Sequence, residues 1–307
     1  MKRWKKIRRK IRYTTIYVVI RFLISLSAIV PRKTWLTVFG FFGRLSFYLA
    51  TRSRRITIAN LTMAYGHEKS KAEIHRLARN VFVMVGKNGA DIIRSYRVTS
   101  RDSYEKLRVI HGAEFLHRAY AKGKGVIFLT AHLGAFELCA TEMAVRGYKP
   151  LIIGTAMKDK RLTELLWRQR SKLGASAIER GKETVRLLKT LKAGGTVAIL
   201  IDQDTRVKSV FVDFFGKPCA TPVGAAVLAL KTGASVVPVF LHLRDDGMQE
   251  VNCYPEVELV HTGNEEQDIV ANTQKFTNII EDEIRKYPEQ WVWMHERWKT
   301  KPGEELN

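Results

Sequence analysis

Acidic residues are absent from the beginning of this chain. Its 307 residues contain 52 Lys and Arg against 30 Asp and Glu, a net charge of +22, yet the first acid is Glu68. Fifteen of the basic residues lie within residues 1–55. This imbalance predicts a polyanionic partner for the amino-terminal segment, either a nucleic acid or an anionic membrane face.

Cysteine is scarce, and several motifs of known chemistry are missing. The three cysteines are widely spaced without a Cys-x-x-Cys pair, as expected of small buried hydrophobic residues in a reducing compartment. The chain has no internal repeat and none of the motifs of serine hydrolases, phosphate-binding loops, dinucleotide-binding folds or zinc proteases: Gly-x-Ser-x-Gly, Gly-x4-Gly-Lys-Ser/Thr, Gly-x-Gly-x-x-Gly and His-Glu-x-x-His. These absences exclude four common classes of enzyme site.

A long uninterrupted hydrophobic run is also missing. Residues 16–30 are apolar except for Arg21, and residues 35–50 are apolar and aromatic except for Arg44. Basic residues followed by apolar, aromatic helices favour a membrane surface over nucleic acid. The first segment is near the lower length limit for a membrane span, and Arg21 is costly at mid-depth. We therefore expect helices that lie in or dip into the cytoplasmic leaflet, while a single span stays open.

This start does not match a secretory signal peptide. A small-residue cleavage site is lacking, and a second apolar segment follows at once.

The rest of the chain predicts an α/β fold. Residues 51–110 have helical periodicity. From residue 125 onward, short apolar runs alternate with helical stretches, which is typical of a largely parallel sheet flanked by helices. The expected strands lie near residues 126–130, 150–154, 176–179, 196–202 and 235–241, and the expected helices near 135–146, 160–173, 183–192, 222–231 and 268–287. The predicted organisation is a membrane anchor (1–50), a helical segment (51–110) and an α/β domain (111–307).

His132 and Glu137 are the strongest candidates for catalysis. His132 follows the apolar run 126–129 and Glu137 lies at the start of helical periodicity, so His132 belongs at a strand-to-helix turn. Parallel sheets collect their sites beyond the carboxyl ends of the strands. On one continuous helix the two side chains would point about 140° apart, so they meet only if the helix begins after His132. Gly134 permits such a turn.

A histidine next to a carboxylate suits acyl transfer. A neutral imidazole can take a proton from an alcohol, while a carboxylate on its other nitrogen fixes the tautomer and stabilises the imidazolium. The His-x4-acid spacing occurs twice, and its second copy, from His261 to Glu266, lies in a polar run without a strand before it. We therefore assign the general base to His132 and its orienting partner to Glu137.

The run Gly125-Val-Ile-x-x-Thr130-x-His132-x-Gly134-x-x-Glu137 resembles the His-x4-acid motif of membrane acyltransferases. It is most similar to the lipid A late-acyltransferase family, within the glycerolipid acyltransferase-like folds. Ala135 and Phe136 stand where that family commonly has Asn and Trp.

Later runs resemble further blocks of the same family in the same order. After residues 175–179, Arg180 matches the arginine that the family uses on a phosphate of the acceptor, with Lys182 beside it; a solvated charge cluster is the alternative. Asp202 and Asp204 belong to a block to which the resemblance assigns substrate binding. Asp-x-Asp after a strand also occurs in the metal sites of glycosyltransferases, but the family block needs no metal. The tryptophan-rich segment 287–299 could pack an acyl chain, lie at the membrane interface or belong to the core.

The resemblance implies an enzyme of the cell inner membrane, at its cytoplasmic face. It would move a fatty acyl group from a thioester of acyl carrier protein to a hydroxyl of a lipid A precursor, with no cofactor, no metal and no nucleic acid. Two alternatives stay open. One is an acyltransferase for a lysophospholipid, glycolipid or aminolipid, with acyl-CoA as a possible donor. The other is a non-catalytic protein that binds membranes or nucleic acid.

Overall fold

The computed structural model describes residues 2–98, 100–154, 156–171, 174–179 and 184–304. Its helices are α1 (Lys2–Leu26), α2 (Arg32–Leu49), α3 (Thr51–Tyr65), α4 (Lys71–Ser95), α5 (Arg101–Glu105), α6 (Ala113–Ala121), α7 (Cys139–Val145), α8 (Lys160–Arg170), α9 (Thr184–Lys192), α10 (Gly224–Thr232) and α11 (Glu265–Lys286), with 3₁₀ turns η1 (Phe136–Leu138) and η3 (Pro288–Gln290). Its strands are β1 (Arg108–His111), β2 (Val126–Thr130), β3 (Leu151–Gly154), β4 (Ser176–Glu179), β5 (Thr196–Leu200), β6 (Ser209–Phe214), β7 (Lys217–Pro222), β8 (Ser235–Leu243) and β9 (Gln249–Cys253).

A seven-stranded sheet forms the centre of the α/β part. The strand order is β1-β9-β8-β2-β5-β3-β4. The strands from β8 to β4 are parallel to their neighbours, whereas β9 is antiparallel to β8 and parallel to β1. The predicted α/β class with a largely parallel sheet is therefore confirmed.

Helices cover both faces of this sheet because its central strands are apolar on both sides. In β2 all five residues are buried. Ile127 and Leu129 belong to the core beneath α10, α11 and the tryptophan segment, while Val126 and Phe128 belong to the core beneath α6 and α7. Successive side chains of a strand point to opposite faces, which is why neighbours in β2 enter different cores.

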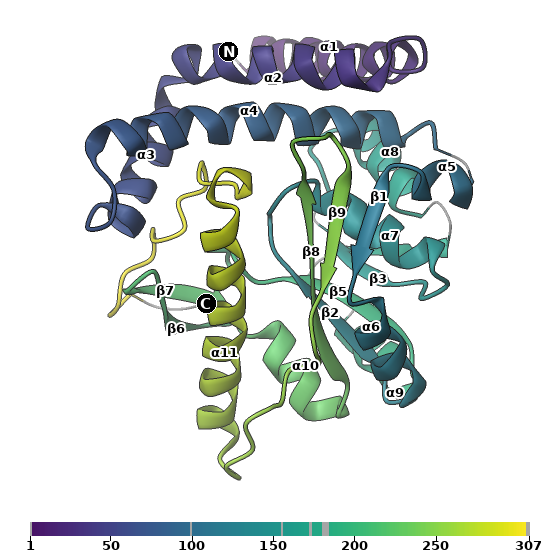
Figure 1. Cartoon of the computed structure of the whole chain (residues 1–307), viewed down its shortest axis with the longest axis vertical. Coiled ribbons are helices and arrows are strands. Elements are labelled where there is room, and N and C mark those ends of the chain that lie inside the picture. Colours follow the sequence, from purple (N-terminus) through teal and green to yellow (C-terminus); the bar gives the residue numbers. More distant parts are fainter. Residues whose placement is uncertain (1, 99, 155, 172–173, 180–183, 305–307) are drawn as a thin grey trace.

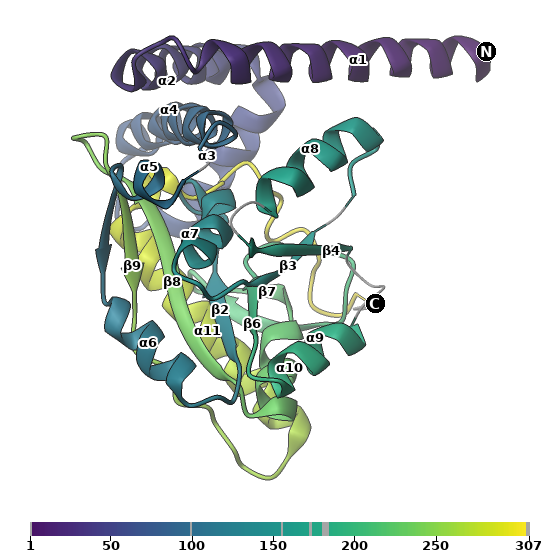
Figure 2. The same cartoon turned by 90° about the vertical axis from the view of Figure 1, so that its right-hand side faces the viewer.

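Helices α1, α2 and α4 form layers at one end of the molecule (Figures 1 and 2). Helix α2 packs closely on α4, since a Cβ at Gly43 would overlap the carbonyl of Phe82 and one at Gly86 would overlap that of Phe39. The amino-terminal half of α1 extends beyond the body of the protein, above α8 (Figure 2). Among the described residues, no helix is both long enough and apolar enough to cross a bilayer.

The sequence predicts the apolar strands of the structure but not the more polar ones. The expected strands correspond to β2, β3, β4, β5 and β8, within three residues at each end. The edge strands β1 and β9 and the separate hairpin β6–β7 were not expected, because charged and polar residues interrupt their apolar pattern. Helices do occupy most of residues 51–110, as predicted, although β1 already lies within that range.

Candidate active site

His132 lies just beyond the carboxyl end of β2, on a turn that only glycine allows. Gly134 has φ of +59°, and a Cβ there would overlap the carbonyl oxygen of Leu241 on β8. The turn is fastened to the carboxyl-terminal segment, because the amide of Gly134 donates to the carbonyl of Gln290 and the amide of Val292 to the carbonyl of His132. His132 is therefore held on a rigid turn and not on a helix, as the sequence predicts.

Asp202 is the carboxylate that holds His132. Strands β2 and β5 are parallel neighbours, with Thr130 opposite Leu200. His132 comes two residues after Thr130 and Asp202 two residues after Leu200, so the two side chains leave the same end of the sheet side by side. Asp202 Oδ1 is 2.8 Å from His132 Nδ1, and its Oδ2 accepts the backbone amide of His132 at 2.7 Å and Trp291 Nε1 at 2.8 Å. The side chain of Asp202, for which the sequence predicts substrate binding, is fully buried and contacts the histidine.

The negative charge of Asp202 fixes the tautomer of His132. Burial alone raises the pKa of Asp202, but the nearby His132 and the hydrogen bonds from His132 and Trp291 outweigh it and lower the pKa to about 2. An ionised carboxylate only accepts hydrogen bonds, so His132 Nδ1 carries a hydrogen and donates it. The lone pair of the neutral ring is then on Nε2, which suits a general base.

Glu137 does not occupy the position that its spacing predicts. Its carboxylate forms two hydrogen bonds with Arg170 at the end of α8, Oε2 with Nε at 2.9 Å and Oε1 with Nη2 at 2.7 Å. The chain enters a 3₁₀ turn at Phe136, and the Phe136 ring lies edge-on to His132 with centroids 4.7 Å apart. The expected contact between Glu137 and His132 is thus replaced by Glu137–Arg170, because Phe136 takes the place beside the imidazole.

The remaining predicted residues are placed as follows. Asp204 accepts a hydrogen bond from the backbone amide of Thr300 at 2.8 Å and so fastens the carboxyl-terminal segment. Arg180 and Lys182 lie outside the described residues. In the part of the chain that the structure describes, no three His, Cys, Asp or Glu side chains are grouped as a metal ion would need.

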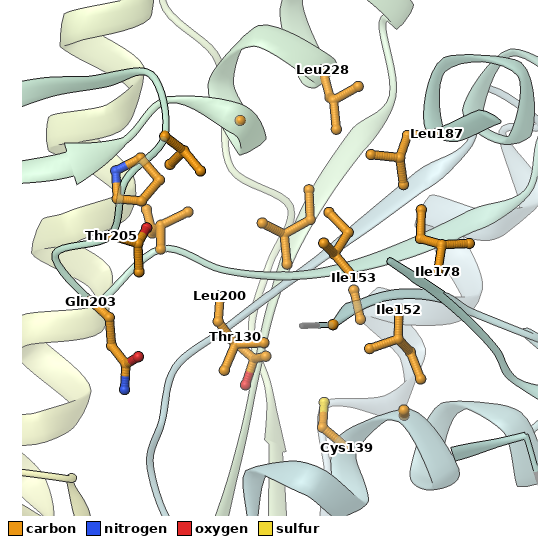
Figure 3. Close-up of a pocket in the computed structure, with 18 of the residues that line it drawn as sticks. Thr130, Cys139, Ile152, Ile153, Ile178, Leu187, Leu200, Gln203, Thr205 and Leu228 are labelled. Atoms are coloured by element: carbon orange, nitrogen blue, oxygen red, sulfur yellow. The ribbon is translucent and has the colours of Figure 1, made fainter. Parts of the chain in front are cut away.

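A cavity of about 650 Å³ opens beside His132. Its lining comes from strands β2, β3, β4 and β5, from helices α9 and α10, and from the segment 136–140 after His132. Aliphatic side chains dominate the lining, and Figure 3 shows several of them directed into the space: Ile152, Ile153, Ile178, Leu187, Leu200 and Leu228. His132, Glu137, Arg170 and Gln203 are among its polar groups. This size and this apolar lining are typical of a pocket for a small molecule or a hydrocarbon chain.

The tryptophan-rich segment belongs to the core and supports the site. Trp291 and Trp293 are 1% and 0% exposed. Asn60 donates to the carbonyls of Trp293 and His295, at 2.9 and 2.8 Å, which ties this segment to α3. Of the three roles that the sequence leaves open for these tryptophans, core packing is the one observed. The support that Trp291 gives to Asp202 was missed, because no local pattern joins positions 89 residues apart.

In comparisons with known proteins, this chain is similar to bacterial acyltransferases. The family model for "Bacterial lipid A biosynthesis acyltransferase" matches residues 1–300. A phosphatidylinositol mannoside acyltransferase of Mycolicibacterium smegmatis is 26% identical over 73% of this chain and 79% of its own length. The lipid A biosynthesis lauroyltransferase of Escherichia coli is 28% identical over 85% and 83%, and a lipid A biosynthesis acyltransferase of Haemophilus influenzae is 26% identical over 93% and 88%.

Proposed function

The chain belongs to the bacterial lipid A biosynthesis acyltransferase family and is an O-acyltransferase with a lipid acceptor, and we propose the donor and the acceptor of its reaction. We propose that it moves a fatty acyl group from the thioester of acyl carrier protein to a hydroxyl of a lipid A precursor. The observation that carries this proposal is the His132–Asp202 pair, whose histidine lines a largely apolar cavity of about 650 Å³.

The reaction uses Nε2 of His132 as the general base. Nε2 takes the proton of the acceptor hydroxyl while its oxygen attacks the thioester carbonyl carbon. The resulting imidazolium is stabilised by Asp202, whose negative charge is retained because its pKa is about 2. The C–S bond then breaks, and the thiolate takes the proton from His132. The products are an ester and a free thiol, and the base contributes about 10²–10⁴-fold to the rate.

The cavity accounts for the acyl chain of the donor. Its aliphatic lining offers a hydrocarbon chain an environment away from water, which is favourable at about 0.8 kcal/mol per buried CH₂ group. Its polar groups include His132, so a chain that enters the apolar part can leave its thioester at the base. Acyl-CoA carries the same acyl chain as acyl carrier protein, and competition between the two donors in a thioester-consumption assay separates them.

A second acceptor class is favoured by one observation. The mycobacterial relative that matches this chain is named for phosphatidylinositol mannoside, which is a glycolipid and not a lipid A precursor. Mass spectrometry of the lipids of a deletion strain separates the two. Loss of one acyl chain from lipid A supports the first acceptor, and loss from another glycolipid supports the second.

We place the enzyme on the cytoplasmic face of the inner membrane through α1 and α2. Phe22, Phe41 and Phe42 are 62%, 63% and 56% exposed on helices that carry basic residues and no acid. Aromatic side chains surrounded by cations suit the interface of an anionic membrane. Replacing all three by serine should move the protein from liposomes into solution, while Val270→Ser, at an exposed position of α11, should not. Unchanged binding of the triple variant after a high-salt wash would refute this placement.

The decisive experiment for the reaction is the assay of purified protein with acyl-thioester donor and lipid acceptor. Ester formation equal to thioester consumed is expected, and hydrolysis of the thioester without any acylated lipid would contradict the proposal.

A further inference from the structure

The Glu137–Arg170 pair is a second polar feature of the cavity, apart from His132–Asp202. Both side chains line the cavity and are largely buried, with exposures of 20% for Glu137 and 12% for Arg170. An ion pair held in two parallel hydrogen bonds orients the guanidinium plane. Arg170 therefore has a fixed direction in the site.

The anchoring of α8 fixes Arg170 further. The preceding residue, Gln169, is buried and its Nε2 donates to Ser95 Oγ on α4 at 2.8 Å. On the other side, Arg170 Nη1 lies over Gly154, the last residue of β3, at the place that a Cβ would occupy. A glycine at that position is thus what lets the guanidinium lie against the carboxyl end of β3.

Among the described residues, Glu137 is the hydrogen-bond partner of Arg170, and this contact leaves donors of the guanidinium unused. A guanidinium carries five N–H donors, and the contact uses one on Nε and one on Nη2. Nη1, which lies over Gly154, takes no part in the contact with Glu137. In a chain of net charge +22, an oriented guanidinium with remaining donors suits an oxyanion such as phosphate.

The location separates this group from the reacting carbonyl. Strand β5 lies between β2 and β3, and strands are about 4.8 Å apart, so Gly154 is roughly 10 Å from the strand that carries His132. An anion on Arg170 therefore belongs to another part of the substrate than the carbon attacked at His132.

We propose that Arg170 binds a phosphate of the substrate and that Glu137 positions the guanidinium of Arg170. This proposal rests on the proposed function. The acceptor headgroup is the source that the position beyond the strand ends favours, and the phosphate next to the thiol arm of the donor is the other source. Glu137 in this arrangement acts on Arg170 and not on the general base.

The test compares steady-state kinetics of Arg170→Ala, Arg170→Lys and Glu137→Gln with wild type. Arg168→Ala is the matched control, because Arg168 is an exposed cation on the same helix. The substrates are a phosphorylated acceptor and the same acceptor after phosphatase treatment, each with acyl-phosphopantetheine and acyl-pantetheine as donors. Thermal unfolding verifies that every variant is folded.

We expect Arg170→Ala to raise KM for the phosphorylated acceptor about 10–100-fold with little change in kcat, which is the range for a hydrogen bond to a charged group. Arg170→Lys should recover part of this loss, and Glu137→Gln should raise the same KM by a smaller factor. With the dephosphorylated acceptor the variants should equal wild type. A KM effect that follows the donor phosphate supports the phosphate site and assigns it to the donor.

Two results would overturn the proposal without touching acyl transfer itself. One is a loss of kcat in Arg170→Ala that is the same for all substrates. The other is a shifted pH–rate profile in Glu137→Gln with KM unchanged, which would mean that Glu137 acts on His132 and not on Arg170. By contrast, failure of wild type to acylate either acceptor would refute the proposed function.

Discussion

Two histidine–carboxylate pairs in this molecule have similar contact distances but differ in solvent access and in the ring nitrogen that faces the carboxylate. His132 Nδ1 lies 2.8 Å from Asp202, and His242 Nε2 lies 2.6 Å from Glu283. Both carboxylates are buried, but the side chain of His132 is 23% exposed and lines the cavity, whereas that of His242 is 0% exposed. The comparison teaches that a carboxylate on one nitrogen does not make a base unless a pocket meets the other.

The surroundings of the two carboxylates are also alike. Glu283 accepts the hydroxyl of Tyr254 at 2.5 Å and the ammonium of Lys286 at 3.1 Å, and the ring of His242 stacks on Tyr287. Burial raises the pKa of Glu283, but the hydrogen bonds from His242 and Tyr254 outweigh it and hold the pKa below its usual range. Asp202 shows the same balance. The second pair therefore fastens α11 to β8, and we expect it to serve stability.

The largest expected effect breaks this comparison at its histidines. His132→Ala should lower kcat by about 10²–10⁴-fold, since the general base is lost. His242→Ala should leave kcat nearly unchanged in the folded protein and lower the free energy of unfolding by about 1–3 kcal/mol, because buried Glu283 loses one hydrogen bond and keeps those from Tyr254 and Lys286. Parallel kcat and denaturant measurements decide. More than a tenth of wild-type activity in folded His132→Ala would remove it as the base.

The next effect concerns the carboxylate beside the base. Asp202→Asn keeps the shape but removes the charge that stabilises imidazolium, so kcat should fall about 100-fold or more. Steady-state kinetics of the folded variant measure this loss. A kcat of Asp202→Asn equal to that of wild type would separate Asp202 from the mechanism.

The matching change at the other pair is Glu283→Gln. We expect a loss of about 3 kcal/mol in the free energy of unfolding at neutral pH, with kcat maintained. Since the folded pKa of Glu283 is lowered, its contribution is present above the unfolded pKa of about 4.3 and is lost as pH falls through the folded value. The difference between variant and wild type should therefore shrink in acid. Urea unfolding at pH 7 and at about pH 4 tests this, and a difference that grows in acid would contradict it.

The sequence alone located His132 at the end of a strand but not the carboxylate that contacts it, for a physical reason. Local periodicity locates β2 and its turn, and therefore His132, because a strand's pattern is contained in a few neighbouring residues. The pairing with Asp202 depends on β5 lying next to β2, and strand order is a property of the whole sheet. Glu137 is near in sequence, but Phe136 occupies the space beside the ring. From the sequence, Asp202 could be recognised only as an acid at the end of a strand. That pattern, together with the family resemblance, led to the prediction that it binds substrate.

The smallest expected effects come from removing one hydrogen bond at each pair. Trp291→Phe keeps an aromatic ring in the core but removes the 2.8 Å hydrogen bond to Asp202 Oδ2. The pKa of Asp202 should rise from about 2 yet stay far below 7, since His132 still donates twice, so the carboxylate remains charged. We expect kcat to fall by only about 3–10-fold, which corresponds to a hydrogen bond of about 1 kcal/mol. Tyr254→Phe removes the equivalent bond to Glu283 and should cost about 1–3 kcal/mol of stability with no change in kcat. If the two substitutions instead affect kcat equally, the two pairs are coupled through the core, and access to the cavity is not what distinguishes them.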